Sequence, residues 1–180
     1  MSRPRLNAQL YKPIAGIVPW VEPAFFKDSA ETKYLWTQQV LMHDSSQIVS
    51  TRESSVVYEG PLSLAGLIFG GIRGHVYSDI DKTIGKGGAI RRVDSDSHKE
   101  SFEKLFDGRV DVTLLPGSST DFLIWQNDAA DYVFVSPKPH SRTARRVLVL
   151  NQRADLREFI DHHFAAAGPD AEWANICQKY

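Results

Sequence analysis

The stretch AGLIFGGIRG, residues 65–74, predicts the fold more directly than any other part of the sequence. An apolar run ends there at glycines, and Tyr77 follows three residues after Gly74. We expect a buried strand over Leu67–Ile72 and a helix over His75–Ile84. A strand that stops at glycine and opens into a helix presents backbone N–H groups to an anionic or polar ligand.

A second unit of the same kind follows along the chain. Ser97 and Glu100 have the spacing of a capping box, which predicts the start of a helix. That helix is expected to end at Gly108, and the apolar run Val110–Leu115 predicts the next buried strand. We expect Asp111 to bond backbone groups at this corner between helix and strand.

Further elements are predicted on both sides of these two units. They are a short helix over 6–11, a buried strand over 14–21, a helical turn in 23–33, paired strands over 36–49 with a turn at 43–46, a strand over 89–93, a helix starting at Ser118 or Ser119 and running to Trp125, strands over 132–136 and 145–150, and helices over 155–166 and 170–180. Strands that alternate with helices indicate an α/β fold with mixed or parallel strand pairing.

Composition limits the classes of function. The 180 residues suffice for one large domain or two small lobes, and a formal net charge of −1 gives no reason to expect nucleic acid or an anionic membrane as partner. Cys177 is the only cysteine, which excludes an intramolecular disulfide and a zinc site of several thiolates.

The basic clusters Arg91-Arg92 and Arg142–Arg146 are expected on the solvated surface. His162 and His163 are adjacent on a predicted helix, so they cannot chelate a metal together.

Three motifs resemble those of the bacterial solute-binding proteins of family 3. They are PLSLAGLIFGGIRGHVY (61–77), FEKLFDGRVDVTLL (102–115) and RADLREFIDHHFAAAGPDAEWANICQKY (153–180). The family has the type 2 periplasmic-binding-protein fold, an α/β fold of two lobes with mixed sheets. Its members serve ABC importers, commonly for polar amino acids. The resemblance assigns residues 1–55 to a partial lobe 1, 56–137 to lobe 2, and 138–180 to the return to lobe 1 and the C-terminal helices. It also implies that the opening strand–helix–strand is absent, so that lobe 1 is incomplete.

The resemblance implies that a small polar solute, amino-acid-like or another small organic acid, binds between the lobes without a cofactor or metal and is delivered to an ABC permease. The residues at the family's ligand positions are Trp20, Glu22 and Lys27 in lobe 1, and Arg73, Gly74, His75, Val76 and Tyr77 in lobe 2. Lys27 falls near an arginine position of the family, and a lysine lacks the bidentate fork of arginine. Pro116 stands where amino-acid binders have an acidic residue, so the α-amino-acid clamp is not reproduced.

Several alternatives stay open from the sequence. Trp20 can stack on a ligand or pack into the core, Tyr77 can reach the cleft or pack under its helix, and Arg73 can bind an anion or form a surface ion pair. A cyclohexadienyl-dehydratase-like enzyme on the same scaffold would use Glu22 or His75 as acid or base. A truncated relic without a ligand is the third possibility.

Localisation also has two alternatives. The resemblance implies the periplasm, yet Met1–Lys12 lacks the apolar h-region of a signal peptide, so a true start at Met1 implies the cytoplasm. No run approaches the ~18 apolar residues of a membrane span, so direct insertion into a membrane is not expected.

Overall fold

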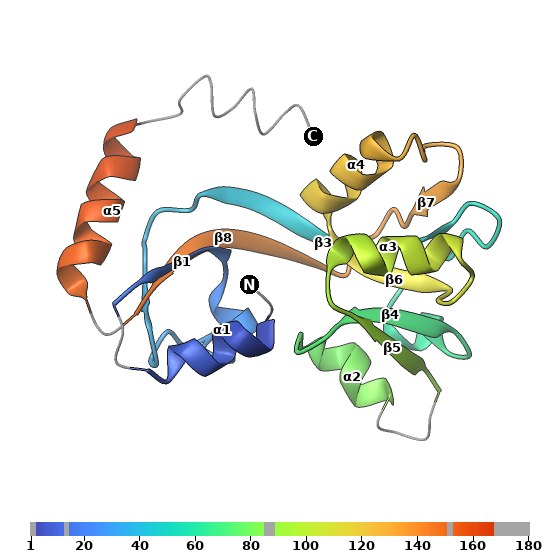
Figure 1. Cartoon of the computed structure of the whole chain (residues 1–180), viewed down its shortest axis with the longest axis horizontal. Coiled ribbons are helices and arrows are strands. Elements are labelled where there is room, and N and C mark those ends of the chain that lie inside the picture. The colour runs from blue at the N-terminus through green and yellow to red at the C-terminus, as the bar shows by residue number, and fades with distance from the viewer. Residues whose placement is uncertain (1–2, 13–14, 85–88, 151–152, 168–180) are drawn as a thin grey trace. The chain divides into compact units, whose positions relative to one another are not determined.

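The computed structural model describes residues 3–12, 15–84, 89–150 and 153–167 (Figure 1). The chain divides into two compact units. Unit 1 holds residues 1–5 and 45–142, and unit 2 holds residues 6–44 and 143–180. The predicted helix over 170–180 and the predicted glycine stop at 85–88 lie outside the described residues. The predicted lobe boundaries at 55/56 and 137/138 stay a prediction.

Unit 1 is built on a mixed sheet, as predicted. Its strands are β3 (Met42–Thr51), β4 (Ile68–Ile72), β5 (Arg91–Ser95), β6 (Val112–Pro116) and β7 (Val133–Val135). Strand β4 runs parallel to both β5 and β6, whereas β3 pairs antiparallel with β6 and with β7. Strand β4 therefore lies between two parallel neighbours, and the loop that follows it leaves from the interior of the sheet.

Both faces of this sheet are covered, since neighbouring residues of a strand point to opposite faces. Ile48 packs on one face with Ile80 of α2 (Ser78–Ile84) and with η2 (Pro61–Leu64). Val49 packs on the other face with Phe102 of α3 (His98–Phe106) and with α4 (Gly117–Gln126). Unit 1 is therefore a three-layer α/β/α unit, which is the arrangement that buries both faces of a sheet with parallel strands.

Unit 2 is centred on β8 (Ser141–Val149), which pairs antiparallel with β1 (Ile17–Val21) and with β2 (Leu35–Trp36). Leu148 packs on one face with Trp36 and with the side chains of α1 (Arg3–Leu10) and η1 (Pro23–Phe26). Val149 packs on the other face with Ile160 of α5 (Ala154–Ala167). The predicted helix over 155–166 is confirmed by α5.

Several local predictions are confirmed by specific contacts. The N–H of Glu100 donates to Oγ of Ser97 at 3.1 Å, which caps α3 as the sequence predicts. Gly108 follows that helix with a φ of 64°, in the left-handed region that favours glycine. The N–H of Ile68 donates to Oδ2 of Asp111 at 2.6 Å, so this carboxylate has the structural role expected of it.

Several predictions about these elements are wrong. Residues 43–46, expected as a turn, lie within the continuous strand β3, and Ser46 pairs with Pro116 of β6. Ser118 and Ser119 lie inside α4 rather than capping it. The strand over 14–21 was expected to be buried, yet β1 is largely exposed, with Ile17 at 48%. None of the helices in the described part of the chain has the length and apolarity to cross a bilayer.

Candidate functional site

Two segments carry most of the residues predicted to contact a solute, one in each unit, and Glu22 and Lys27 follow the second. The first is Ile72–Tyr77, which follows β4 in unit 1 and is called loop 72–77 here. The second is Val18–Val21 of β1 in unit 2, called bulge 18–21. Each is described within its own unit.

Loop 72–77 is not the start of a helix, which corrects the prediction of a helix over His75–Ile84. Helix α2 begins at Ser78, three residues later, and the N–H of His75 donates instead to the carbonyl of Ile72 at 2.9 Å, in a turn. The N–H of Tyr77 donates to Oδ2 of Asp81 at 2.7 Å, which satisfies the backbone just before the helix. The loop is therefore a turn with its own hydrogen bonds.

The predicted residues of this loop differ in exposure. Arg73 and Val76 are exposed, His75 is half-buried, and Gly74 is exposed with a φ of 80°. Nε of Arg73 donates to Oδ1 of Asp96 at 2.8 Å, so the surface ion pair considered for Arg73 is present.

Tyr77 supports the loop from inside the protein. It is only 6% exposed, and its ring packs edge-on against Phe69 with 5.1 Å between ring centroids. The N–H of Ile72 donates to the Tyr77 hydroxyl oxygen at 2.9 Å. Burial raises the pKa of Tyr77 to about 12, so the phenol stays neutral. Of the two alternatives for Tyr77, the structure shows packing in the core.

Arg92 of β5 holds loop 72–77 in place. Its Nη2 donates to the carbonyl oxygens of Ile72 at 3.1 Å and of His75 at 3.2 Å. Its Nη1 pairs with Asp81 and its Nε with Asp94, both at 2.7 Å. Burial lowers the pKa of Arg92, but hydrogen bonds and charge from the two carboxylates raise it above its ordinary value.

The prediction that Arg91-Arg92 lies on the solvated surface is correct for Arg91 and wrong for Arg92. Neighbouring residues of a strand point to opposite faces, so one arginine is exposed and the other is enclosed. Arg92 and Asp94 lie two residues apart on one strand, a spacing that places their side chains on the same face. That pattern was the sequence signal for this ion pair.

Gly71 makes room for Arg92. A Cβ at position 71 would lie 2.7 Å from Nε of Arg92 and 2.8 Å from Oδ1 of Asp94. Both distances are shorter than any real contact of a Cβ, so the second glycine of the pair at the end of β4 is required by the side chain of a neighbouring strand.

Bulge 18–21 interrupts the pairing of β1 with β8. Val18 pairs with Leu148 and Val21 with Arg146, so β1 has one more residue than β8 over this interval. Trp20 lies within this bulge. Its φ is 64°, in the left-handed region, and its side chain is 43% exposed. A non-glycine residue in the left-handed region costs about 1–2 kcal/mol. An exposed aromatic side chain is therefore held on a strained backbone.

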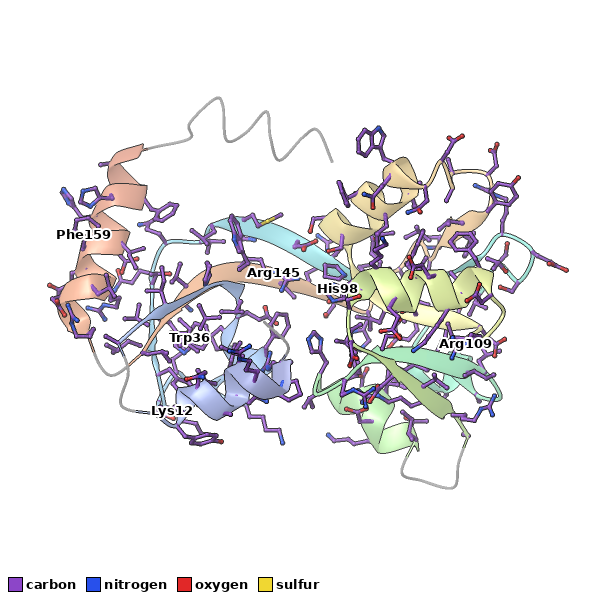
Figure 2. The ribbon with its side chains drawn as sticks, viewed as in Figure 1. Lys12, Trp36, His98, Arg109, Arg145 and Phe159 are labelled. Atoms are coloured by element: carbon purple, nitrogen blue, oxygen red, sulfur yellow. The ribbon has the colours of Figure 1, made fainter. Side chains whose placement is uncertain are left out.

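Arg145 of β8 anchors this bulge. Its Nη1 donates to the carbonyl oxygen of Trp20 at 3.3 Å, and its Nη2 pairs with Asp44 at 3.2 Å. Its guanidinium lies over the ring of Phe25, 5.0 Å from the ring centroid. Arg145, labelled in Figure 2, is buried, so its predicted place on the solvated surface is wrong.

Glu22 and Lys27 follow the bulge. Glu22 is half-buried, and burial raises its pKa although the charge of Arg145 and a backbone hydrogen bond from Ala144 lower it. Lys27 is exposed at the end of η1 with a φ of 53°, and its carbonyl accepts a hydrogen bond from Nζ of Lys33 at 3.1 Å. Glu22 therefore lies beside the arginine that anchors the bulge.

A further polar cluster of unit 1 was not found from the sequence. Nε2 of His140 and Oδ1 of Asp79 are 2.8 Å apart, and the Tyr58 hydroxyl donates to Oδ2 of Asp79 at 3.4 Å. Burial raises the pKa of Asp79, but the hydrogen bond and charge of His140 outweigh it, so this pKa is lowered overall. His140 and Asp79 are 61 residues apart, and no local pattern links them.

Comparison with solved structures identifies the fold. A mutant of the arginine-binding protein ArgBP from T. maritima matches with a TM-score of 0.75 and 18% identity, covering 100% of this chain and 75% of that chain. An ancestral arginine-binding protein bound to arginine matches with a TM-score of 0.76 and 16% identity, covering 100% and 77%. A periplasmic binding protein of Salmonella typhimurium with high arginine specificity matches with a TM-score of 0.71 and 16% identity, covering 99% and 78%.

These matches confirm the predicted α/β fold of the periplasmic binding proteins. No family model matches the chain, and no curated protein does either. The implied absence of the opening strand–helix–strand stays a prediction.

Proposed function

We propose that this protein binds a small polar organic solute without transforming it, and that it delivers the solute to an ABC importer from the periplasm. The likeness of fold over the whole chain to proteins solved as arginine-binding proteins carries the proposal. The solute is an amino-acid-like molecule or another small organic acid.

The two segments support this function in different ways. Loop 72–77 offers exposed side chains and the left-handed Gly74 on a backbone held by Arg92. Bulge 18–21 offers the exposed ring of Trp20, with the half-buried Glu22 two residues later. Strained residues that the surrounding structure holds in place cluster at ligand sites, which makes Trp20 the strongest single candidate.

We expect this protein to lack at least one of the contacts by which the family binds an α-amino acid. Pro116 ends β6 and precedes α4, at the position where amino-acid binders of the family have an acidic residue. A proline offers no carboxylate to an α-ammonium group, and Lys27 offers a point charge instead of a bidentate fork to a carboxylate. A screen should therefore include organic acids as well as arginine and other polar amino acids.

Thermal shift with that panel, followed by calorimetry, tests the proposal. A solute at 100 times its Kd stabilises the folded protein by about 2.7 kcal/mol, which is a measurable rise in Tm. Gly74→Ala and Gly66→Ala both place a side chain in the left-handed region, at φ values of 80° and 84°. A Cβ at position 74 would also lie 3.3 Å from Pro4, whereas a Cβ at position 66 would have nothing within 4 Å, so Gly74→Ala should lose more stability. Only Gly74→Ala should lose the response to solute.

Trp20→Gly sharpens the test. Glycine takes the left-handed conformation freely, so the variant removes the backbone strain at position 20. We expect it to lose most of the solute-induced rise in Tm. A flat response of the wild-type protein across the panel would contradict the proposal and support a relic without a ligand.

The environment of Glu22 supports a second candidate function, that of a cyclohexadienyl-dehydratase-like lyase. A carboxyl group whose pKa is raised by burial is suited to act as a general acid. Loss of water from a prephenate-like acid, measured by product formation and abolished in Glu22→Gln, would support the enzyme over the binding protein.

A further inference from the structure

Glu22, which follows bulge 18–21, differs from the other half-buried carboxylates in its partners. Asp81 and Asp94 pair with Arg92, and Glu100 pairs with Lys104. Glu22 is half-buried as they are, but no arginine, lysine or histidine of the described residues forms a salt bridge with it. Its charge is therefore not matched by an opposite charge in direct contact.

The carboxylate of Glu22 also accepts few hydrogen bonds. Glu22 immediately precedes η1, yet its side chain does not cap that helix, and the N–H of Phe25 donates to the Glu22 carbonyl instead, at 3.1 Å. The N–H of Ala144 is the backbone group that bonds to the carboxylate. A carboxylate has about four lone-pair sites. Most of its capacity to accept hydrogen bonds is therefore available to a solute.

Burial opposes the charged form of Glu22. Desolvation raises the pKa of this carboxyl, although the charge of Arg145 and the bond from Ala144 lower it. Asp28 and Asp79 are desolvated as well, but their hydrogen-bond partners lower their pKa values overall. A cationic group in contact with Glu22 would supply the stabilisation that these other carboxylates already have.

Two arginines of β8 lie close to this carboxylate, and each has a carboxylate partner of its own. Nη2 of Arg145 pairs with Asp44 at 3.2 Å, and the next residue along the strand, Arg146, pairs with Glu31. Each of these ion pairs has no net charge. They therefore leave the negative charge of Glu22 as the excess at this place.

Two lysines lie at the other end of η1. Lys27 ends this helix, and Nζ of Lys33 donates to the Lys27 carbonyl at 3.1 Å. Both side chains are exposed, and neither pairs with Glu22 in the described part of the chain. Exposed ammonium groups are well hydrated and their repulsion is screened by salt, so they oppose a second cation only weakly.

On the premise of the solute binding proposed above, we propose that Glu22 binds the cationic group of the solute, so that this protein selects organic cations over organic acids. The exposed indole ring of Trp20, on the adjoining bulge, suits the same class of solute, because an aromatic face attracts a cation. Solutes with a cationic group and a carboxylate qualify, since the cationic group decides the selection.

Three probes test this preference on the full chain. They are arginine, agmatine, which is arginine without its carboxylate, and glutarate, which is a dianion. Thermal shift and calorimetry should show binding of arginine and agmatine and none of glutarate. If glutarate binds and the two cations do not, the role of Glu22 is refuted while solute binding stands. If no solute of the wider panel binds either, both proposals are refuted.

Glu22→Gln removes the charge and keeps the size of the side chain. It should weaken agmatine binding at least about tenfold, because a hydrogen bond to a charged group is lost. Glu53→Gln changes an exposed glutamate of unit 1 and should keep the wild-type affinity. Equal affinities of Glu22→Gln and the wild type would refute the proposal even if cations bind.

Glu22→Asp guards against an effect of misfolding. It keeps the charge on a shorter side chain, so it should bind agmatine more tightly than Glu22→Gln does. Equally weak binding in both variants, with the wild-type urea denaturation curve, would show that the charge at position 22 is not what holds the cation.

Two further substitutions test the surroundings of the carboxylate. Trp20→Leu should weaken agmatine binding by about two- to fivefold, since an exposed aromatic face contributes modestly to holding a cation. Lys27→Gln removes a nearby positive charge and should tighten agmatine binding by up to about twofold at low salt. Weaker binding in Lys27→Gln would contradict the charge balance described here.

Discussion

Loop 72–77 is held by the half-buried Arg92 and bulge 18–21 by the buried Arg145, and the two arginines have different partners. Arg92 pairs with two carboxylates and also donates to two backbone carbonyls of the loop. Arg145 pairs with one carboxylate, donates to one carbonyl and lies over an aromatic ring. The loop therefore has its conformation fixed mainly by charged hydrogen bonds.

The bulge holds its conformation in another way. Trp20 sits in the left-handed region where its side chain is disfavoured, whereas Gly74 occupies the same region of the loop at little cost. In loop 72–77 the residue at the left-handed position is a glycine, which suits that conformation. In bulge 18–21 it is a tryptophan, which is held there by the surrounding contacts. Substitutions can distinguish the two mechanisms.

The largest effect is expected from Arg92→Ala. Removal of the guanidinium leaves Asp81 and Asp94 and the carbonyls of the loop without their donor, which should cost about 3 kcal/mol. Denaturation by urea measures the loss. Arg91→Ala, the exposed neighbour, should change stability by less than about 0.5 kcal/mol. Equal losses in the two variants would show that Arg92 does not hold the loop.

Arg145→Ala should cost less, about 2 kcal/mol, because Arg145 pairs with one carboxylate, that of Asp44, whereas Arg92 pairs with two. The exposed Arg142→Ala is the control. In a double-mutant cycle with Asp44→Asn, the second substitution should cost little once Arg145 is gone. Strict additivity would mean that the ion pair does not stabilise unit 2.

Gly71→Ala should destabilise unit 1 by about 1–2 kcal/mol, since the new methyl group displaces the guanidinium of Arg92. The same substitution in an Arg92→Ala background should cost less, because only Oδ1 of Asp94, 2.8 Å from the new Cβ, then has to move. Thermal unfolding of the four proteins of this cycle measures the coupling, and an equal cost in both backgrounds would contradict the proposed clash.

Acidic pH should weaken unit 1 through Asp79. Its pKa is lowered in the folded protein by His140, so its contribution is present above the ordinary value of 3.8 and is lost as the pH falls through the folded pKa. Asp79→Asn should cost about 0.5 kcal/mol at pH 7, since the side chain is 45% exposed, and progressively less as the pH falls below 3.8. Unfolding followed from pH 7 to pH 2 tests this, and a constant difference would refute it.

Glu22 should behave in the opposite way. Burial raises its pKa, so ionisation opposes folding, and this penalty develops as the pH rises above the ordinary value of 4.5. Glu22→Gln should therefore be about 0.5 kcal/mol more stable than the wild type at pH 7 and equal to it at pH 3. The reverse sign would mean that Arg145 stabilises the charged carboxylate by more than burial opposes it.

Local patterns predicted much of the fold. The capping box at Ser97, the glycine at 108, the apolar run of β4 and the stripe of α5 each depend on residues close in sequence. Three ordered motifs predicted the periplasmic-binding-protein fold through a resemblance, and the solved structures confirm it. The position of Asp111 at its corner was predictable for the same reason.

The failed predictions involve partners that are distant in sequence. Arg92 rather than Arg91 is enclosed because its side chain lies on the face of β5 that meets Asp81. Arg145 pairs with Asp44, which is about a hundred residues away in the sequence. Tyr77, which precedes α2, is buried against Phe69, and its hydroxyl oxygen accepts a hydrogen bond from the N–H of Ile72. The strain at Trp20 exists only because β1 pairs with β8 around an extra residue.

By itself, the sequence determined most of the strands and helices, though not all of their ends, because hydrophobic periodicity, capping and glycine act over a few residues. The tertiary structure alone decided which charged side chains are enclosed and which backbone is strained. Those outcomes depend on the electrostatics and packing of groups that only folding brings within hydrogen-bond distance of one another.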